Sequence, residues 1–301
     1  MTMKISFPTL FALLIIFTFI ACKDRHSQTQ RSVVQSEEST PVAPVDTSTI
    51  TEEFQDIEIP FLDGDEPRQI LRRETYSSSY NHETRCPNWV AWVLTRESAQ
   101  GDVEKKIWFD DNGCALGING FKPEHVKGSY IFDAEAEDPR PEFADWDLMP
   151  TGASHGHMCP AADCKTSKEA MNQSFLLTNL CVQAEKLNTG SWNRLEMSCR
   201  DWAIKYERIF IVAGPIFNNN KVSQKMGNIA IPDGFFKVIL CMEGTPKAIG
   251  FVFANNNEKH NRDEAVRSVD DVEQLTGIDF FPQLPNDIEE VVESQANYNA
   301  W

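Results

Sequence analysis

The sequence is organised around TGASHGHMCPAAD at residues 151–163, FLLTNLCVQ at residues 175–183 and NTGSWNRLEMSCR at residues 188–200. Imidazole, carboxamide, carboxylate and guanidinium side chains all fall within this span. Such groups can take a proton from water, ligate a hard cation and meet the charge of a phosphate. The stretch is therefore typical of metal-assisted cleavage of a phosphate ester.

Two helices are expected in this part of the chain. Residues 191–206 carry one apolar face at helical spacing, formed by Trp192, Leu195, Cys199 and Trp202. An earlier helix is expected to begin at Thr166-Ser-Lys-Glu169, because this pattern is a capping box.

Strands are expected on both sides of these helices. Aromatic and β-branched residues predict strands over residues 88–95, 208–214, 235–242 and 248–253, the second of them ending in a Gly-Pro turn. Residues 96–150 are interpreted as loops and short strands, and a final helix is expected from Ser268 to Gly277. Strands and helices segregate rather than alternate, so we predict an α+β fold with a mixed, mainly antiparallel sheet.

The N-terminal residues have the pattern of an export signal. Lys4 precedes an apolar run from Leu10 to Ile20, and the run ends at Ala21-Cys22. Residues 1–22 are interpreted as a lipoprotein signal peptide, with a lipid on Cys22 anchoring the chain to the membrane of a bacterial cell envelope. The alternative is an ordinary signal peptide with an incidental cysteine. We expect an acidic disordered linker over residues 23–67, a catalytic domain over 68–290 and a tail over 291–301.

Charge and cysteine content bear on partners and compartment. The net charge is −17, but residues 32–67 and 282–301 contain no basic side chain, and residues 68–281 carry only −6. Even −6 is not a basic surface, which counts modestly against tight nucleic-acid binding. Of eight cysteines, seven would remain besides Cys22, and some pairing is expected after export. A zinc site at Cys159 and Cys164 is the competing interpretation of that pair.

His157 is the candidate general base, because a neutral imidazole can take a proton from water near neutral pH. Glu196 and Arg200 are four residues apart on the predicted helix. They are either a surface ion pair or a pair in which Glu196 orients a metal-bound water and Arg200 meets a phosphate. Asn188 lies just before the helix, and its side-chain oxygen could cap the helix or ligate Mg²⁺.

The order and spacing of these residues resemble the sugar-non-specific DNA/RNA endonucleases of the ββα-metal (His-Me finger) superfamily. That family carries Asp-Arg-Gly-His, then Asn-x-x-Pro-Gln, then Asn-x-Gly-x-Trp-x-x-Leu-Glu and an Arg four residues later. The matching residues here are Gly156-His157, Asn179 to Gln183, Asn188 to Glu196, and Arg200. Val182 stands where the family usually has Pro.

The resemblance implies an Mg²⁺-dependent endonuclease, with Mn²⁺ as a substitute, acting on DNA and RNA. His157 would be the general base, Asn188 the direct metal ligand, Glu196 the holder of a metal-bound water and Arg200 the phosphate contact, with Asn179 and Gln183 in support. The family's Asp-Arg is Ser154-His155 here, so His155 would contact phosphate as a cation only when protonated. The rival hypothesis is a catalytically weak or inactive nuclease-fold lipoprotein that acts as a binding or structural module.

Overall fold

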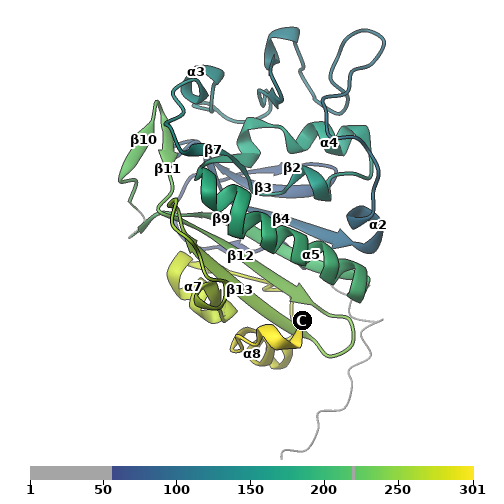
Figure 1. Cartoon of the computed structure of the whole chain (residues 1–301), viewed down its shortest axis with the longest axis vertical. Helices are drawn as coiled ribbons and strands as arrows, with labels where there is room; N and C mark the ends of the chain where they lie inside the picture. Colours follow the sequence, from purple (N-terminus) through teal and green to yellow (C-terminus); the bar gives the residue numbers. More distant parts are fainter. Residues whose placement is uncertain (1–55, 219–220) are drawn as a thin grey trace, which may run out of the picture. The chain divides into compact units, whose positions relative to one another are not determined.

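A seven-stranded antiparallel sheet forms the centre of the computed structural model, which describes residues 56–218 and 221–301 (Figure 1). The strand order is β14-β13-β12-β9-β4-β3-β2, and every neighbouring pair is antiparallel. The α+β prediction with an antiparallel core is confirmed. The predicted signal peptide, Cys22 and most of the predicted linker lie outside the described residues.

The strands of the central sheet are β2 (Gln69–Arg72), β3 (Tyr76–Asn81), β4 (Cys86–Thr95), β9 (Arg208–Ile216), β12 (Gly234–Cys241), β13 (Lys247–Ala254) and β14 (Val266–Arg267). The remaining strands form two-stranded pairs: β1 (Phe61–Leu62) with β15 (Ile278–Asp279), β5 (Val126–Lys127) with β6 (Tyr130–Ile131), β7 (Ala153–His157) with β8 (Leu180–Ala184), and β10 (Gln224–Met226) with β11 (Ile229–Ile231).

The described α-helices are α2 (Arg96–Ala99), α3 (Phe143–Trp146), α4 (Lys168–Ser174), α5 (Asn193–Tyr206), α6 (Arg262–Ala265), α7 (Val269–Thr276) and α8 (Asn286–Glu293). Short 3₁₀ turns lie at Pro123–His125, Ala161–Asp163, Leu177–Asn179 and Tyr298–Ala300, and a π-helical turn spans Leu187–Trp192. None of these described helices is long and apolar enough to cross a membrane.

Helices cover the sheet on both faces, with α5 on one side and α7 and α8 on the other (Figure 1). The period-2 alternation of the strands explains this layering. On β12, Phe235 and Ile239 join the core under α5, whereas Phe236 and Val238 join the core that includes Val272 of α7. A strand buried on both faces has an almost continuous apolar sequence, as β12 does.

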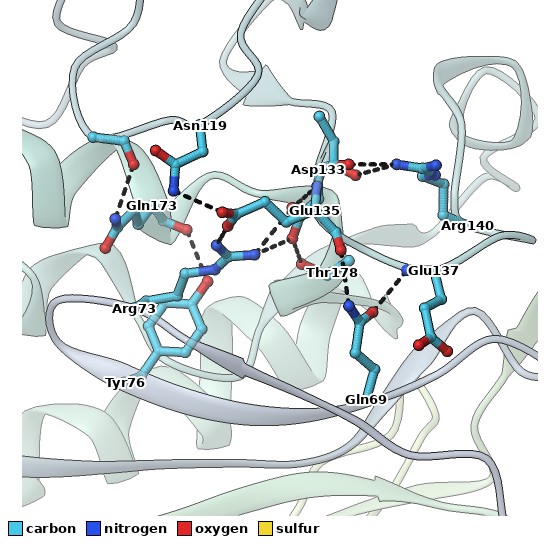
Figure 2. Close-up of polar contacts among 12 residues, drawn as sticks. Gln69, Arg73, Tyr76, Asn119, Asp133, Glu135, Glu137, Arg140, Gln173 and Thr178 are labelled. Atoms are coloured by element: carbon cyan, nitrogen blue, oxygen red, sulfur yellow. Dashed lines mark hydrogen bonds and ion pairs between the residues drawn. The ribbon is translucent and has the colours of Figure 1, made fainter.

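The irregular segment 96–150 is held beside the sheet by a polar network (Figure 2). Arg73 is almost buried and forms ion pairs with Asp133 and Glu135. The hydroxyl of Thr178 donates to the same Asp133 carboxylate. Because Thr178 precedes Asn179, this network connects the edge of the sheet to the start of β8.

Several boundaries differ from the sequence-based expectations. Strand β9 continues through Gly214-Pro215 instead of ending there in a turn. The ladder with β4 ends at Ala213, so the missing N–H of Pro215 is tolerated. Gly214 is required because a Cβ there would lie 2.6 Å from the Asn88 carbonyl oxygen. Helix α4 is capped by Ser167 rather than Thr166.

The folded part also extends beyond the expected limits of residues 68–290. In the expected linker, Ile57 is buried and Phe61 pairs with Asp279. In the expected tail, the Trp301 ring packs on Trp202 with 4.8 Å between centroids. The helix expected to be final, α7, is followed by α8. The cysteines of the described part are Cys86, Cys114, Cys159, Cys164, Cys181, Cys199 and Cys241, and all are free, contrary to the expected pairing.

Candidate active site

A β-hairpin and a helix bring the predicted site residues together. Strands β7 and β8 pair antiparallel, with His157 opposite Leu180 and Ser154 opposite Gln183. The π-helical turn Leu187–Trp192 then leads directly into α5. A hydrogen bond connects this turn to β7, because the Trp192 Nε1 donates to the backbone oxygen of His157 at 3.3 Å. The arrangement is the ββα motif that the sequence predicted.

His157 ends β7, and its Nε2 atom is buried without a hydrogen-bond partner among the residues that the structure describes. Burial lowers the pKa of His157 to about 3, with a smaller contribution from the positive charge of Lys105. The imidazole is therefore neutral at physiological pH and can accept a proton. A buried ring nitrogen with no protein partner is available to accept a hydrogen bond or a proton from a bound water or substrate.

Asn179 bonds the chain beside the β7–β8 pair, and Gln183 packs within that pair. The Asn179 amide accepts from the backbone N of Cys159 at 3.0 Å and donates to the Cys159 oxygen at 2.8 Å, which fixes the chain just after His157. Gln183 is fully buried beside Gly156, where an added Cβ would lie 2.5 Å from its Oε1. This close approach explains the glycine before His157. Neither amide atom of Gln183 has a partner in the described part of the chain.

Asn188 lies in the π-helical turn and is tied to β7. Its Nδ2 donates to the Ser154 Oγ at 2.9 Å, and that hydroxyl in turn donates to the Gln183 backbone oxygen at 3.3 Å. Within residues 56–218 and 221–301 no group donates to the Asn188 Oδ1. A fixed amide with an available oxygen fits Mg²⁺, which takes few protein ligands and keeps several waters. Helix α5 has no side-chain cap, so capping does not explain Asn188.

Glu196 and Arg200 do not form the surface pair that their spacing allowed. The Arg200 guanidinium instead bonds the Asp163 carboxylate at 2.8 Å, and Asp163 is only 1% exposed. Asp163 also accepts from Trp92 Nε1 at 3.2 Å. Burial raises the pKa of Glu196 to about 7, and the positive charge of Lys237 is the strongest influence opposing that rise.

Lys237 is the unexpected member of this cluster. It lies in the middle of β12, is fully buried, and its Nζ has no hydrogen-bond partner in the described chain. Its ammonium lies 4.8 Å and 4.5 Å from the ring centroids of Trp92 and Trp192. Cation–π contacts of this kind stabilise a desolvated ammonium. The sequence signal was a single charge within the apolar run of β12.

His155 lies between two aromatic rings. Its ring stacks on Tyr130 at 4.1 Å and on Trp146 at 4.6 Å between centroids. Burial lowers the pKa of His155 to about 4. The His155 ring is therefore neutral near neutral pH, where the resembled family carries an arginine. Tyr130 and Trp146 come from segment 96–150, which contains no motif that would have marked them as site residues.

Lys105 supplies a positive charge that sequence reasoning missed. The residue is exposed in segment 96–150. Its positive charge acts to lower the pKa of both His157 and Glu196. The site thus has a cation at its edge although His155 is neutral.

Comparisons with known proteins agree with this geometry. The family model described as DNA/RNA non-specific endonuclease matches residues 55–287. The mitochondrial nuclease EXOG of Xenopus laevis is 32% identical over 75% of this chain and 61% of its own length. Nuclease C1 of Cunninghamella echinulata is 29% identical over 74% of this chain and 87% of its own. A nuclease of Nostoc is 27% identical over 76% and 78%.

The chain spans about three fifths of the length of the mitochondrial EXOG nucleases that it matches. Among solved structures, a chain of the EndoG/EndoGI complex is similar, with a TM-score of 0.56 and 22% identity over 75% of this chain and 89% of that one. At this identity the likeness shows the fold, which is the same α+β architecture with an antiparallel core.

Proposed function

Since this chain belongs to the DNA/RNA non-specific endonuclease family, we propose that it is a metal-dependent endonuclease that hydrolyses phosphodiester bonds of DNA and RNA with little sequence preference. The observation that carries the proposal is the neutral, unpartnered His157 Nε2 in a ββα motif that also holds Asn188 and Glu196. No described element of the site is arranged to read base edges, and backbone contacts alone carry no sequence information.

Each site residue has a role that its surroundings support. His157 accepts the proton of the attacking water, because its ring is neutral and Nε2 has no competing partner in the described chain. Glu196 accepts a hydrogen bond from a water when it is ionised. Arg200 remains close to the substrate phosphate while Asp163 fixes one side of its guanidinium.

The proposed metal is Mg²⁺, with Mn²⁺ as a substitute, and Asn188 would hold it through Oδ1. When bound, this ion would supply positive charge that stabilises the developing charge on the phosphate. Lys105 contributes an exposed cation at the same site. It partly replaces the family arginine, because neutral His155 cannot attract phosphate.

A plasmid-nicking assay tests the proposal. Wild-type chain should relax supercoiled DNA and degrade RNA with Mg²⁺ or Mn²⁺, lose both activities in EDTA, and give no discrete cleavage pattern. Cutting at one recognition sequence, or full activity in EDTA, would contradict it. If folded wild-type protein cuts neither nucleic acid but still binds one of them, the chain is a binding module on a nuclease fold.

We also propose that the chain is tethered to a bacterial cell-envelope membrane through a lipid on Cys22, with residues 23–55 as part of an acidic linker. The apolar run from Leu10 to Ile20 followed by Ala21-Cys22 supports this. Replacing Cys22 by Ser should block processing or release the protein from the membrane fraction. Normal processing and membrane association of that variant would contradict the proposal.

A further inference from the structure

The C-terminal segment 268–301 carries eight acidic side chains and no Lys, Arg or His. Three of its carboxylates come from helices that lie on the sheet face opposite α5 (Figure 1). Asp270 and Glu273 are three residues apart in α7, so they share a helix face. Glu293 is the last residue of α8.

These three side chains converge. One carboxylate oxygen from each lies within 4.8 Å of the corresponding oxygens of the other two. Oxygens that share one Ca²⁺ lie about 2.3–2.6 Å from the ion, so two of them are at most about 5 Å apart. The spacing of the three oxygens therefore already suits one ion of this size.

Glu293 points to a ligand independently of the cluster. The residue is only 3% exposed, and its Oε1 is buried with no hydrogen-bond partner among the residues that the structure describes. Buried carboxylates are normally paired or hydrogen-bonded. By contrast, Glu273 is already oriented, since its Oε1 accepts from the backbone N of Phe280 at 2.8 Å.

The surroundings contain negative charge without compensation. Burial raises the pKa of Glu293 to about 9, and the strongest neighbouring charges contributing to that rise are all carboxylates: Glu273, Glu289, Asp270 and Asp279. Burial and neighbouring carboxylates likewise raise the pKa of Glu273 to about 7. Segment 268–301 offers no basic side chain to neutralise this cluster, which leaves it open to a proton or a cation from solution.

We propose that Asp270, Glu273 and Glu293 form a Ca²⁺ site that joins α7 to α8. Ca²⁺ suits the donors, which are all hard oxygens, and its flexible coordination accepts carboxylates from two helices with water completing the shell. Mg²⁺ demands a tighter octahedron and loses its waters reluctantly. Zn²⁺ favours nitrogen and sulfur ligands, and this site offers neither. The site shares no residue with the proposed nuclease centre.

Thermal unfolding of the metal-stripped full chain tests this without any catalytic readout. The experiment uses the Asn188→Ala background, so that the proposed catalytic metal site does not contribute. Ca²⁺ should raise the Tm saturably, by about 5 °C once it exceeds its Kd about a hundredfold. Mg²⁺ at the same concentration should raise it much less. The absence of a saturable Ca²⁺ effect, or an equal effect of Mg²⁺, would overturn the proposal.

Matched substitutions locate the site. Glu293→Gln keeps the side-chain shape and should abolish the Ca²⁺-dependent shift. Asp270→Asn changes an exposed residue that should not affect folding, and it should weaken Ca²⁺ binding at least about tenfold. Asp287→Asn, an exposed carboxylate on α8 outside the cluster, should leave the Ca²⁺-dependent rise in Tm unchanged. A Ca²⁺ effect that survives both Glu293→Gln and Asp270→Asn would also overturn the assignment.

Discussion

The two faces of the central sheet, one covered by α5 and the other by α7 and α8 (Figure 1), differ in how their buried charge is balanced. Under α5, the carboxylates of Asp163 and Glu196 lie in a cluster with the cations of Arg200 and Lys237. Between α7 and α8, Glu293 and its neighbours are carboxylates only. The first group balances its charge within the protein, and the second does not.

The difference in charge balance distinguishes the proposed nuclease site, which contains Glu196, from the proposed Ca²⁺ site, which contains Glu293. Burial raises the pKa of both Glu196 and Glu293, but Lys237 opposes the rise at Glu196, where the value is about 7. At Glu293, where the value is about 9, the strongest neighbouring charges are carboxylates that add to the rise. Glu196 can therefore be ionised near neutral pH without help from solution, whereas Glu293 needs a proton or a metal ion.

The largest effect is expected at His157. His157→Ala should lower the rate of plasmid cleavage about 10²–10⁴-fold, because the variant has no general base. The Tm should change little, since the His157 Nε2 makes no hydrogen bond in the described part of the protein. His82→Ala, in the turn after β3, is the control and should keep full activity. A His157→Ala enzyme that cuts at the wild-type rate would refute the assignment of the base.

Lys237→Met removes one of the two cations that balance the carboxylates of Asp163 and Glu196 on the α5 face. Removing the cation that lowers the Glu196 pKa should move the pH–rate profile to higher pH. Activity at pH 7 should fall about tenfold for each pH unit by which the Glu196 pKa rises, and it should recover as the pH is raised.

Lys247→Met is the matched control for Lys237→Met. Lys247 begins β13, and its ammonium lies 3.9 Å from the Tyr206 ring centroid. Tyr206 follows Glu196 by ten residues in α5, which is about 15 Å along the helix. Its pH–rate profile should match wild type. Identical pH–rate profiles for wild type and Lys237→Met would show that Lys237 does not lower the pKa of Glu196 in the active enzyme.

Local pattern in the sequence predicted helix α5, whereas the β7–β8 pair was implied only by the family resemblance. The 3.6-residue spacing of Trp192, Leu195 and Cys199 correctly placed α5 and its buried face. The motif residues then fell on one ββα unit, since β7, β8 and α5 are close in sequence. Gly214-Pro215 was wrongly expected to be a turn, because local pattern does not reveal that β12 pairs with β9 through Pro215 after the ladder with β4 has ended.

Residues that act through tertiary contacts were missed. Nothing near Lys237 in the sequence shows that β12 passes under α5, so its link to Glu196 appears only in the fold. Likewise, Tyr130 and Trp146 meet His155 from an irregular segment with no periodic pattern. The spacing of Glu196 and Arg200 suggested a pair on one helix, but Asp163 is the actual partner of Arg200.

Without metal, the carboxylate cluster of Asp270, Glu273 and Glu293 should make the free energy of unfolding depend on pH. The folded-state pKa of Glu293 is raised above its ordinary value, so its contribution to stability is fully present below about pH 4.5. It is lost as pH rises towards about 9. In EDTA, wild type should therefore lose stability relative to Glu293→Gln over this range, by at most about 1.4 kcal/mol per pH unit. Urea unfolding at pH 5, 7 and 9 measures this, with Asp287→Asn as control. If the free energy of unfolding changed with pH in the same way for wild type and Glu293→Gln, the pKa of Glu293 would not be raised in the folded state.

The smallest effect is expected at the edge of the nuclease site, where Lys105 supplies an exposed cation. Lys105→Ala should weaken substrate binding about threefold and lower the slope of log affinity against log salt by about one, because one phosphate contact is lost. Lys106→Ala is a matched neighbour, since the Lys106 ammonium is engaged by Glu104 at 2.6 Å and lies over the Trp108 ring. Its salt slope should equal that of wild type. Lys105 also lowers the pKa of Glu196, so Lys105→Ala should move the pH–rate profile upward in the same direction as Lys237→Met, but by less, because solvent screens an exposed charge. Equal salt slopes for the two alanine variants would place the phosphate-binding cation elsewhere.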